Sequence, residues 1–281
     1  MQYGLSIFPT DYTVQPDELA KRAEERGFES LWFPEHTHIP VERKTPWPGG
    51  PDLPREYNHT YDPFVACSVA AAATTSLKVA TGICLIIQHD PIVLAKTIAT
   101  VDRLSGGRFI FGIGAGWNRE EIENHGTEFK TRFRLLRERV LAMKALWTQE
   151  QASFHGQFVD FDPVYSYPKP LQQPHPPIVM GGDGATTFDR VVQFCDGWLP
   201  ISRGGALPAG LGDKVIELKR RLEAAGRDPA SVSITLFGAA PNRDQVDELQ
   251  RMGLDRAIFA LPVRPAADVW PVLDEYAELI K

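Results

Sequence analysis

The sequence predicts an α/β protein in which eight parallel strands close into a (β/α)8 TIM barrel with an insertion after the fourth helix. Short apolar runs alternate with amphipathic helical segments along all 281 residues, and eight such repeats in a chain of this length are typical of a closed parallel barrel. An open doubly wound sheet is the alternative. No Gly-x-Gly-x-x-Gly follows the first predicted strand, which weighs against a dinucleotide-binding sheet. We expect residues 1–281 to form a single domain.

The first half of the chain contains four strand-and-helix repeats. The predicted strands are residues 3–8, 30–34, 78–84 and 108–113. The first three helices begin with a proline, which suits the first helical turn because that turn needs no hydrogen-bond donor from it; these prolines are Pro16, Pro63 and Pro91. The fourth helix has the clearest 3.6-residue period, with apolar side chains at Phe133, Leu136, Val140, Met143 and Trp147.

The second half repeats the pattern after an interruption at residues 151–176. Four prolines between 168 and 176 exclude a helix there, so we interpret this segment as an insertion with a hairpin around 154–161. Four more strands with helices after them follow. These strands are residues 177–181, 197–200, 232–237 and 256–259, and the helix after the first of them begins near Ala185. The last helix spans residues 266–279.

Composition and charge limit the classes of partner. Hydrophobic residues make up 43% of the chain and the net charge is −6, so the protein has a real core and no electrostatic reason to bind nucleic acid or an anionic membrane. Three widely spaced cysteines indicate reduced thiols rather than a disulfide framework. No apolar run approaches the ~20 residues of a membrane span, and no signal peptide is apparent. We expect a cytoplasmic protein that acts on a small molecule.

The strand that ends near residue 34 is followed by Glu35, His36, Thr37 and His38. Active sites of TIM barrels lie at the carboxyl ends of the strands, and a carboxylate beside an imidazole suits proton transfer near neutral pH. The alternative is a pair that only caps the strand. His36 and His38 also resemble part of a metal site, but other strand ends offer only Asp183 as a further ligand. We therefore predict catalytic roles for Glu35 and His36 and no metal.

Three other predicted strand ends are rich in glycine. The Gly82–Ile83 step allows a bulge or a close ligand approach, or is simple strand variation. Gly114 and Gly116 remove side chains beside Trp117, so that a flat ring could approach the backbone. A helix begins within the turn 181–187, and its free N–H groups favour an anion. The predicted cofactor-binding residues are Thr81, Gly82, Ile83, Gly114, Gly116, Trp117, Gly181, Gly182, Asp183, Gly184 and Thr187.

These strand ends give the chain a family resemblance. With the segments 27–36, 91–96, 100–109, 112–117 and 195–198, in that order, the chain resembles the luciferase-like monooxygenase superfamily, and specifically its coenzyme F-420 (deazaflavin) branch. The similarity extends from Leu5 to about Pro200.

The resemblance carries expectations for individual residues. It implies a cofactor ring across the barrel mouth, a cis peptide at Gly82–Ile83, a phosphate at residues 182–187 and an acid–base role for His36, and it is compatible with a homodimer. Sugar-phosphate dehydrogenases of this branch have a catalytic glutamate where this chain has Trp117, with Glu120 and Glu121 slightly further on. A glucose-6-phosphate substrate is therefore not expected.

The leading functional hypothesis is an oxidoreductase that transfers a hydride between coenzyme F-420 and a small organic substrate. His36 would donate or accept the proton, Glu35 would orient His36 or stabilise its charge, and the proline-rich segment 41–61 would cover the substrate. An FMN-dependent luciferase-like monooxygenase is the first alternative. A barrel that binds a ligand without turnover is the second, because fold alone does not imply catalysis.

Overall fold

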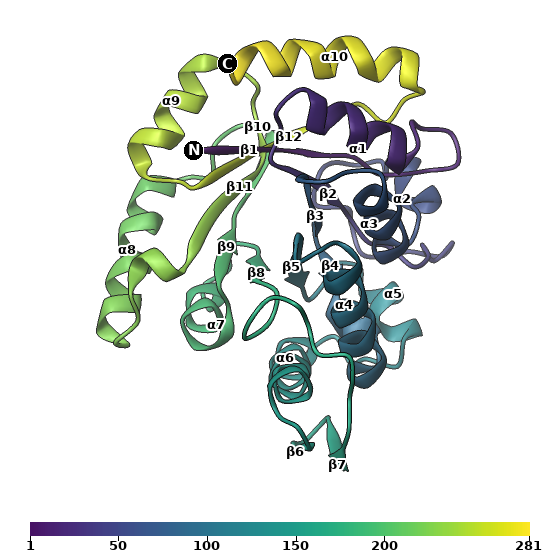
Figure 1. The fold of residues 1–281 in the computed structure, drawn as a ribbon, viewed down its shortest axis with the longest axis vertical. Helices are drawn as coiled ribbons and strands as arrows, with labels where there is room; N and C mark the ends of the chain where they lie inside the picture. Colours follow the sequence, from purple (N-terminus) through teal and green to yellow (C-terminus); the bar gives the residue numbers. More distant parts are fainter.

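Eight parallel strands form a closed ring in the computed structural model, which describes residues 1–281. In order around the ring they are β1 (Gln2–Ser6), β2 (Ser30–Phe33), β3 (Lys78–Thr81), β5 (Phe109–Gly114), β8 (Ile178–Gly181), β9 (Gly197–Leu199), β11 (Ser233–Ala239) and β12 (Arg256–Ala260). The ring closes where β12 pairs in parallel with β1, and in Figure 1 the yellow end of the chain meets the purple one there. The predicted fold class is confirmed.

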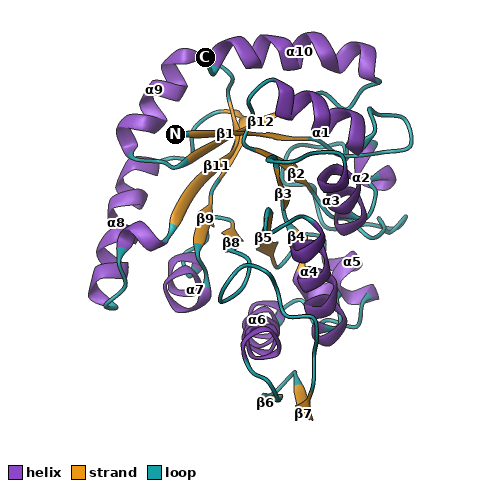
Figure 2. Ribbon diagram, in the orientation of Figure 1, coloured by secondary structure: helices purple, strands orange, loops and turns teal.

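Helices surround the strands, purple around orange in Figure 2. They are α1 (Pro16–Glu25), α3 (Pro63–Ala72), α4 (Pro91–Leu104), α6 (Arg132–Thr148), α7 (Thr187–Phe194), α8 (Leu211–Ala224), α9 (Arg243–Met252) and α10 (Ala266–Leu279). Side-chain caps set three of the starts. Asp62 and Asp90 each accept two backbone N–H bonds at 2.9 Å in the first turns of α3 and α4, and Asn242 accepts one from Gln245 in α9. None of the helices is both long and apolar enough to cross a membrane.

Alternation along the strands divides the apolar residues into two sets. Side chains that point inward fill the barrel with a small cluster made of Trp32, Ala80, Ile110, Val179, Leu199 and Ile258. The opposite faces pack against the helices in a cluster of 60 buried residues. Ile83 and Phe237 pack on the inner cluster but are only partly buried, so the barrel interior is filled and the open surface begins at these two side chains.

Smaller elements depart from the predicted pattern in two strand regions. The predicted strand 78–84 is interrupted by a cis peptide between Gly82 and Ile83, as expected, and resumes as β4 (Cys84–Leu85) on β5. The segment after β4 forms a short 3-10 helix, η1 (Ile86–Gln88). Residues after β9 form β10 (Ile201–Gly205), which pairs with β11.

Short helices account for the other departures. They are α2 (Glu56–His59) within the predicted loop 41–61, α5 (Arg119–Asn124) after β5, and the 3-10 helix η2 (Pro229–Ser231) before β11. α7 starts at Thr187, two residues later than predicted from Ala185.

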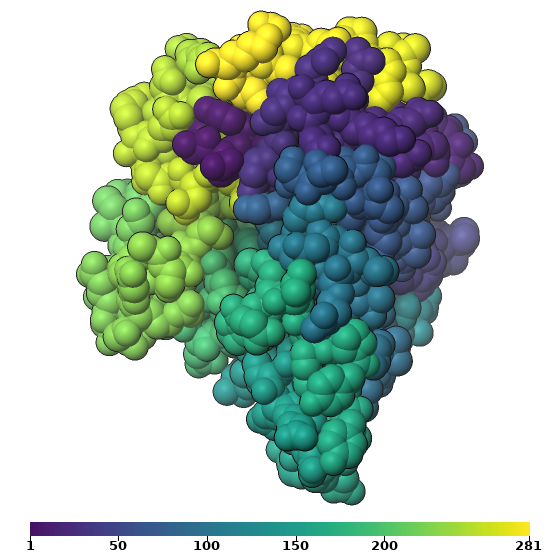
Figure 3. Space-filling model, viewed as in Figure 1, coloured from purple at the N-terminus to yellow at the C-terminus, as the bar shows by residue number.

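The predicted insertion contains the predicted hairpin. β6 (Ala152–His155) and β7 (Asp160–Val164) pair antiparallel, and they project from the barrel at the teal tip at the bottom of Figure 3. At the other end of that view, yellow α10 lies beside purple α1, where Arg22 and Arg26 both form ion pairs with Asp274. The insertion therefore lengthens one side of the molecule without entering the ring.

Candidate active site

His36 pairs with Glu121 at the carboxyl end of the barrel. His36 follows β2, Glu121 lies on α5 after β5, and His36 Nδ1 is 2.8 Å from Glu121 Oε2. Both side chains are buried, at 7% and 1% exposure. A carboxylate on one imidazole nitrogen orients the ring and stabilises its protonated form. Nε2 forms no hydrogen bond within the protein, so it is the nitrogen that can exchange a proton with a ligand.

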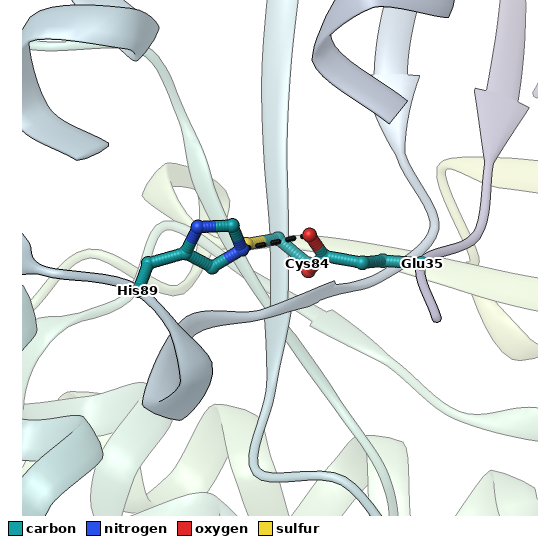
Figure 4. A group of neighbouring side chains, drawn as sticks. All are labelled: Glu35, Cys84 and His89. Carbon is teal, nitrogen blue, oxygen red and sulfur yellow. Dashed lines mark hydrogen bonds and ion pairs between the residues drawn. The ribbon is translucent and has the colours of Figure 1, made fainter. Parts of the chain in front are cut away.

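Glu35 does not contact His36, and the prediction that it orients His36 is wrong. One Glu35 oxygen lies 2.7 Å from His89 Nε2 and the other accepts the backbone N–H of Leu85, as Figure 4 shows for the pair with His89. The two neighbouring side chains, just after the end of β2, therefore have different partners. The partner of His36 was missed because it comes from a helix 85 residues away in the chain.

Glu35 and Cys84, both buried, and the partly buried His89 form a cluster whose potential ligand atoms lie within 4.8 Å of one another. Its chemistry fits an ion pair better than a metal. Both Glu35 oxygens already have donors. Burial, and then the nearby Glu35 charge, hold the pKa of the Cys84 thiol well above its usual range, whereas a metal requires the thiolate. Burial would lower the pKa of His89, but the hydrogen bond and charge of Glu35 raise it above its usual value. The cluster thus anchors β4, directly after the cis peptide.

The glycines at and just after the end of β5 make room for neighbouring side chains of the protein. A Cβ on Gly114 would lie 2.5 Å from Ile83 Cδ1, and one on Gly116 would lie 3.2 Å from Ile122 and 3.3 Å from Leu85. A Cβ on Gly181 would similarly lie 3.2 Å from Ile83 Cγ2. Small residues on β5 and β8 therefore let the Ile83 side chain lie across both strands. The Ile83 side chain, rather than bare backbone, therefore forms the surface at this point of the mouth.

The turn between β8 and α7 offers unpaired backbone donors. The N–H groups of residues 183–186 form no hydrogen bond within the protein, although that of Thr187 donates to the carbonyl of Gly184. Gly182 has φ +103°, a conformation that side chains disfavour. The carboxylate of Asp183 lies 3.6 Å from Lys214 Nζ, which offsets its charge. The predicted anion site thus has the donors that an anion needs, but they precede Thr187.

Aromatic side chains enclose His36. The ring of Tyr57 lies 5.0 Å from it and that of Trp117 lies 6.0 Å from it. Trp47 lies 5.7 Å from Tyr57, and the backbone N–H groups of residues 44 and 45 donate to Glu120. Segment 41–61 therefore closes over the imidazole. Trp117 lies beside His36 and not in the predicted anion-binding turn 181–187, which we call the anion turn.

Two buried acceptors beside His36 have no donor. They are Oε1 of Glu121 and Oδ1 of Asn118, and both residues are 1% exposed. Asn118 Nδ2 lies 3.5 Å from the Glu121 carboxylate. Buried acceptors are normally satisfied, and an exception calls for an explanation such as a bound molecule. The arrangement can hold an imidazole in one orientation and bind a group that brings its own donor.

Comparison with known proteins finds one family. The family model described as "Luciferase-like monooxygenase" matches residues 12–270. A protein of Mycobacterium tuberculosis, described only as uncharacterised, is 38% identical over 281 residues, 99% of this chain and 98% of its own. An F420-dependent glucose-6-phosphate dehydrogenase of Amycolatopsis mediterranei is 28% identical over 94% of this chain and 82% of its own. The FMNH(2)-dependent dimethylsulfone monooxygenase of Pseudomonas putida is 34% identical over 62% and 47%.

Solved structures share the fold over the whole chain. The monooxygenase RslO1 from Streptomyces bottropensis has a TM-score of 0.81 at 20% identity and covers 100% of this chain and 98% of its own. An F420-dependent secondary alcohol dehydrogenase, solved with an F420-acetone adduct, has a TM-score of 0.77 at 19% identity and covers 99% and 97%. Sequence relatives of this chain include both deazaflavin and flavin enzymes.

Proposed function

Because the chain belongs to the luciferase-like monooxygenase family, we propose that it transfers a hydride between coenzyme F-420 and a small organic substrate, with His36 exchanging the proton. The observation that carries this proposal is the 2.8 Å contact between His36 Nδ1 and the buried Glu121 carboxylate. Oxidation of an alcohol, or reduction of a carbonyl, moves a proton as well as a hydride. A buried imidazole with one nitrogen fixed and the other unbonded is suited to that step.

Several residues of the mouth fit a phosphate-bearing cofactor with a flat ring. The unpaired N–H groups of residues 183–186 would hold the phosphate, and the partly buried Ile83 and Phe237 side chains would lie beneath the ring. When bound, the deazaflavin supplies the carbon that accepts or releases the hydride. Gly184 leaves the approach open, because a Cβ there would meet only Thr187 Oγ1, at 3.7 Å.

The protein's own contribution is orientation, charge and exclusion of water. Glu121 would stabilise the imidazolium form of His36 whenever Nε2 takes a proton, and Nε2 would return it in the opposite direction. Tyr57 and Trp117 would limit the access of water to the imidazole, since both rings lie against it. Segment 41–61 carries Tyr57 and would open to admit substrate. A barrel that only binds a ligand would keep its function without His36, so loss of turnover in a His36→Ala variant separates the two functions.

The choice of deazaflavin over FMN is supported by the length over which one relative aligns. The F420-dependent glucose-6-phosphate dehydrogenase aligns along 94% of this chain, whereas the FMNH(2)-dependent monooxygenase aligns along 62%. The substrate need not be shared with the former, since Trp117 stands where a catalytic glutamate is expected in sugar-phosphate dehydrogenases. A small neutral alcohol or ketone suits the aromatic surroundings of His36 better.

The test is a fluorescence titration of the purified protein with coenzyme F-420 and, separately, with FMN. We expect the dissociation constant for F-420 to be lower by roughly tenfold or more, a difference of about 1.4 kcal/mol in binding free energy. Deazaflavin absorbance would then be followed while alcohols and carbonyl compounds are added. Tight FMN binding without F-420 binding would replace this proposal by the flavin monooxygenase.

A further inference from the structure

Three arginines gather around two phenylalanines at the mouth of the barrel. Arg132, at the start of α6, has its Cζ 3.7 Å from the ring centre of Phe129 and 4.6 Å from that of Phe133. Arg119 of α5 lies 4.5 Å from the Phe129 ring and Arg190 of α7 lies 3.8 Å from the Phe133 ring. The two rings hold the guanidinium groups in place, so three separate elements contribute to one basic cluster.

Few carboxylates lie close enough to compensate the positive charge of these three arginines. Neither Arg132 nor Arg190 has a carboxylate oxygen within 4 Å, since Asp189 pairs instead with an arginine of α8 at 2.9 Å. Arg119 has only the exposed Glu123, at 3.6 Å. The buried Nε of Arg132 has no hydrogen-bond partner. Burial, and then the charges of the other two arginines, lower the pKa of Arg132. Like charges held together without compensation favour an anionic ligand.

The cluster adjoins the anion turn but is not needed to complete it. Arg190 Nη2 donates to Thr186 Oγ1 at 2.8 Å, which joins the cluster to the unpaired N–H groups of residues 183–186. Those four donors already offer a site for one phosphate. Three guanidinium groups beside them exceed the needs of a single phosphate and match a ligand that carries additional carboxylates, which arginine binds through paired donors.

We propose that Arg119, Arg132 and Arg190 form a subsite for the carboxylates of the glutamate tail that follows the phosphate in coenzyme F-420. FMN ends at its phosphate and has nothing to place there. The subsite would therefore select the deazaflavin through its tail rather than its ring. This inference rests on the proposed function, and it adds that affinity depends on tail length.

The test measures dissociation constants by deazaflavin fluorescence for F-420 species with short and with long glutamate tails, at low and at high salt. For the unaltered protein we expect the long-tailed species to bind more tightly by roughly tenfold at low salt, with a smaller difference at high salt, because partly exposed charge contacts are screened. Arg119→Gln and Arg190→Gln should each reduce the difference. Arg137→Gln is the matched control, because Arg137 lies on α6 and bonds Gln193 on an exposed surface.

The outcomes distinguish failure of the proposed subsite from failure of the proposed function. Equal dissociation constants for short and long tails in the unaltered protein would overturn the subsite and leave the proposed function standing. A tail dependence that survives in both variants would also overturn it. Failure of every F-420 species to bind would contradict the proposed function instead. Thermal unfolding of each variant verifies that it is folded, and the partly buried Arg132 is left unchanged for that reason.

Discussion

The two ends of the barrel differ in whether their polar groups find hydrogen-bond partners within the protein. At the end where the strands begin, Arg256 donates to both oxygens of Glu29 at 2.7 and 2.8 Å and to the hydroxyl of Thr235. Burial would raise the pKa of Glu29, but Arg256 and Lys78 lower it to about 2. Arg108, just before β5, donates to four backbone carbonyls. Every polar group named here has its partner inside the protein.

At the end where the strands finish, polar groups lack such partners. The second oxygen of Glu121 and the amide oxygen of Asn118 are buried and unbonded, whereas residues 183–186 are exposed and their N–H groups bond no other part of the protein. Each of the two buried oxygens costs about 1–3 kcal/mol while it has no donor. The contrast teaches that polar groups at one end stabilise the fold, while those at the other are kept ready for ligands, as TIM barrels generally divide stability and function.

The largest expected effect is on turnover at the finishing end. Replacing His36 by Ala should lower kcat by about 10²–10⁴-fold, the usual contribution of a positioned acid–base group, and leave the cofactor dissociation constant nearly unchanged. Glu121→Gln should lower it by about 10–100-fold, as loss of an orienting partner does, and should shift the pH profile of the rate. The measurement is a pH–rate series with cofactor affinity determined in parallel.

Glu35 is a matched control for Glu121, because it is also a buried carboxylate that contacts a histidine. Glu35→Gln removes a buried carboxylate that contacts His89 and not His36, so the pH profile should shift less than in Glu121→Gln. If Glu35→Gln shifted the profile more, the pairing of His36 with Glu121 would not control the proton, and the sequence-based assignment to Glu35 would have to return.

The next largest effect is on stability at the starting end. Arg256→Gln leaves Glu29 without its main partner at a site where the two side chains are 9% and 14% exposed. Lys78 Nζ stays 2.9 Å from Glu29, so the loss should be about 1–3 kcal/mol, less than for a buried charge with no partner left, and urea unfolding would measure it. Below the unfolding temperature kcat should match that of the unaltered protein. A loss of turnover without a loss of stability would erase the distinction between the two ends.

A smaller effect is expected in the anion turn. Gly184→Val adds a side chain where a Cβ meets only Thr187 Oγ1, at 3.7 Å, so the free energy of unfolding should hardly change. Cofactor affinity should fall by roughly tenfold, because the added bulk stands between the ligand and the donors of residues 183–186. Gly212→Ala on α8, where a Cβ also finds room, is the control. Unchanged affinity in Gly184→Val would remove the phosphate from this turn.

The smallest effect concerns the pair between Glu35 and His89. Glu35 raises the pKa of His89, so the protonated pair stabilises the folded state below the unfolded pKa of about 6.5, and this contribution is lost as pH rises through the folded pKa. His89→Gln keeps a donor but no charge. The unaltered protein should exceed it in stability by on the order of 1 kcal/mol near pH 6 and by less near pH 9. An advantage that grew with pH would contradict the ion pair.

Local patterns were sufficient for most of the fold. The strands were predictable because buried β segments in a parallel barrel are continuous apolar runs, and the starts of α3 and α4 because each follows an aspartate with a proline after it. Helix α5 was not predicted. It has only six residues, of which Glu121 and Ile122 are buried and the other four are charged or carry an amide. A helix this short and polar shows no apolar period.

The candidate site was only partly predictable because its contacts join distant segments. His36 could be assigned from its place after a strand, but its partner Glu121 depended on α5. The sequence correctly places Gly114 and Gly116 at the mouth. It does not show which side chain occupies the space above each glycine, and at Gly114 that side chain is Ile83. The arginines at 119, 132 and 190 are ordinary surface residues in the sequence, and only the packing around Phe129 and Phe133 brings them together.

The most direct test of the difference between the two ends is an NMR titration of the labelled protein with coenzyme F-420. The backbone amides of residues 183–186 and the imidazole nitrogens of His36 should shift on binding, because they gain partners or a new neighbour there. The amides of Arg108 and Arg256 should not move. Two results would contradict the claim that a ligand supplies the missing partners at the mouth. They are shifts confined to the end where the strands begin, and no shift at residues 183–186 when the cofactor is saturating.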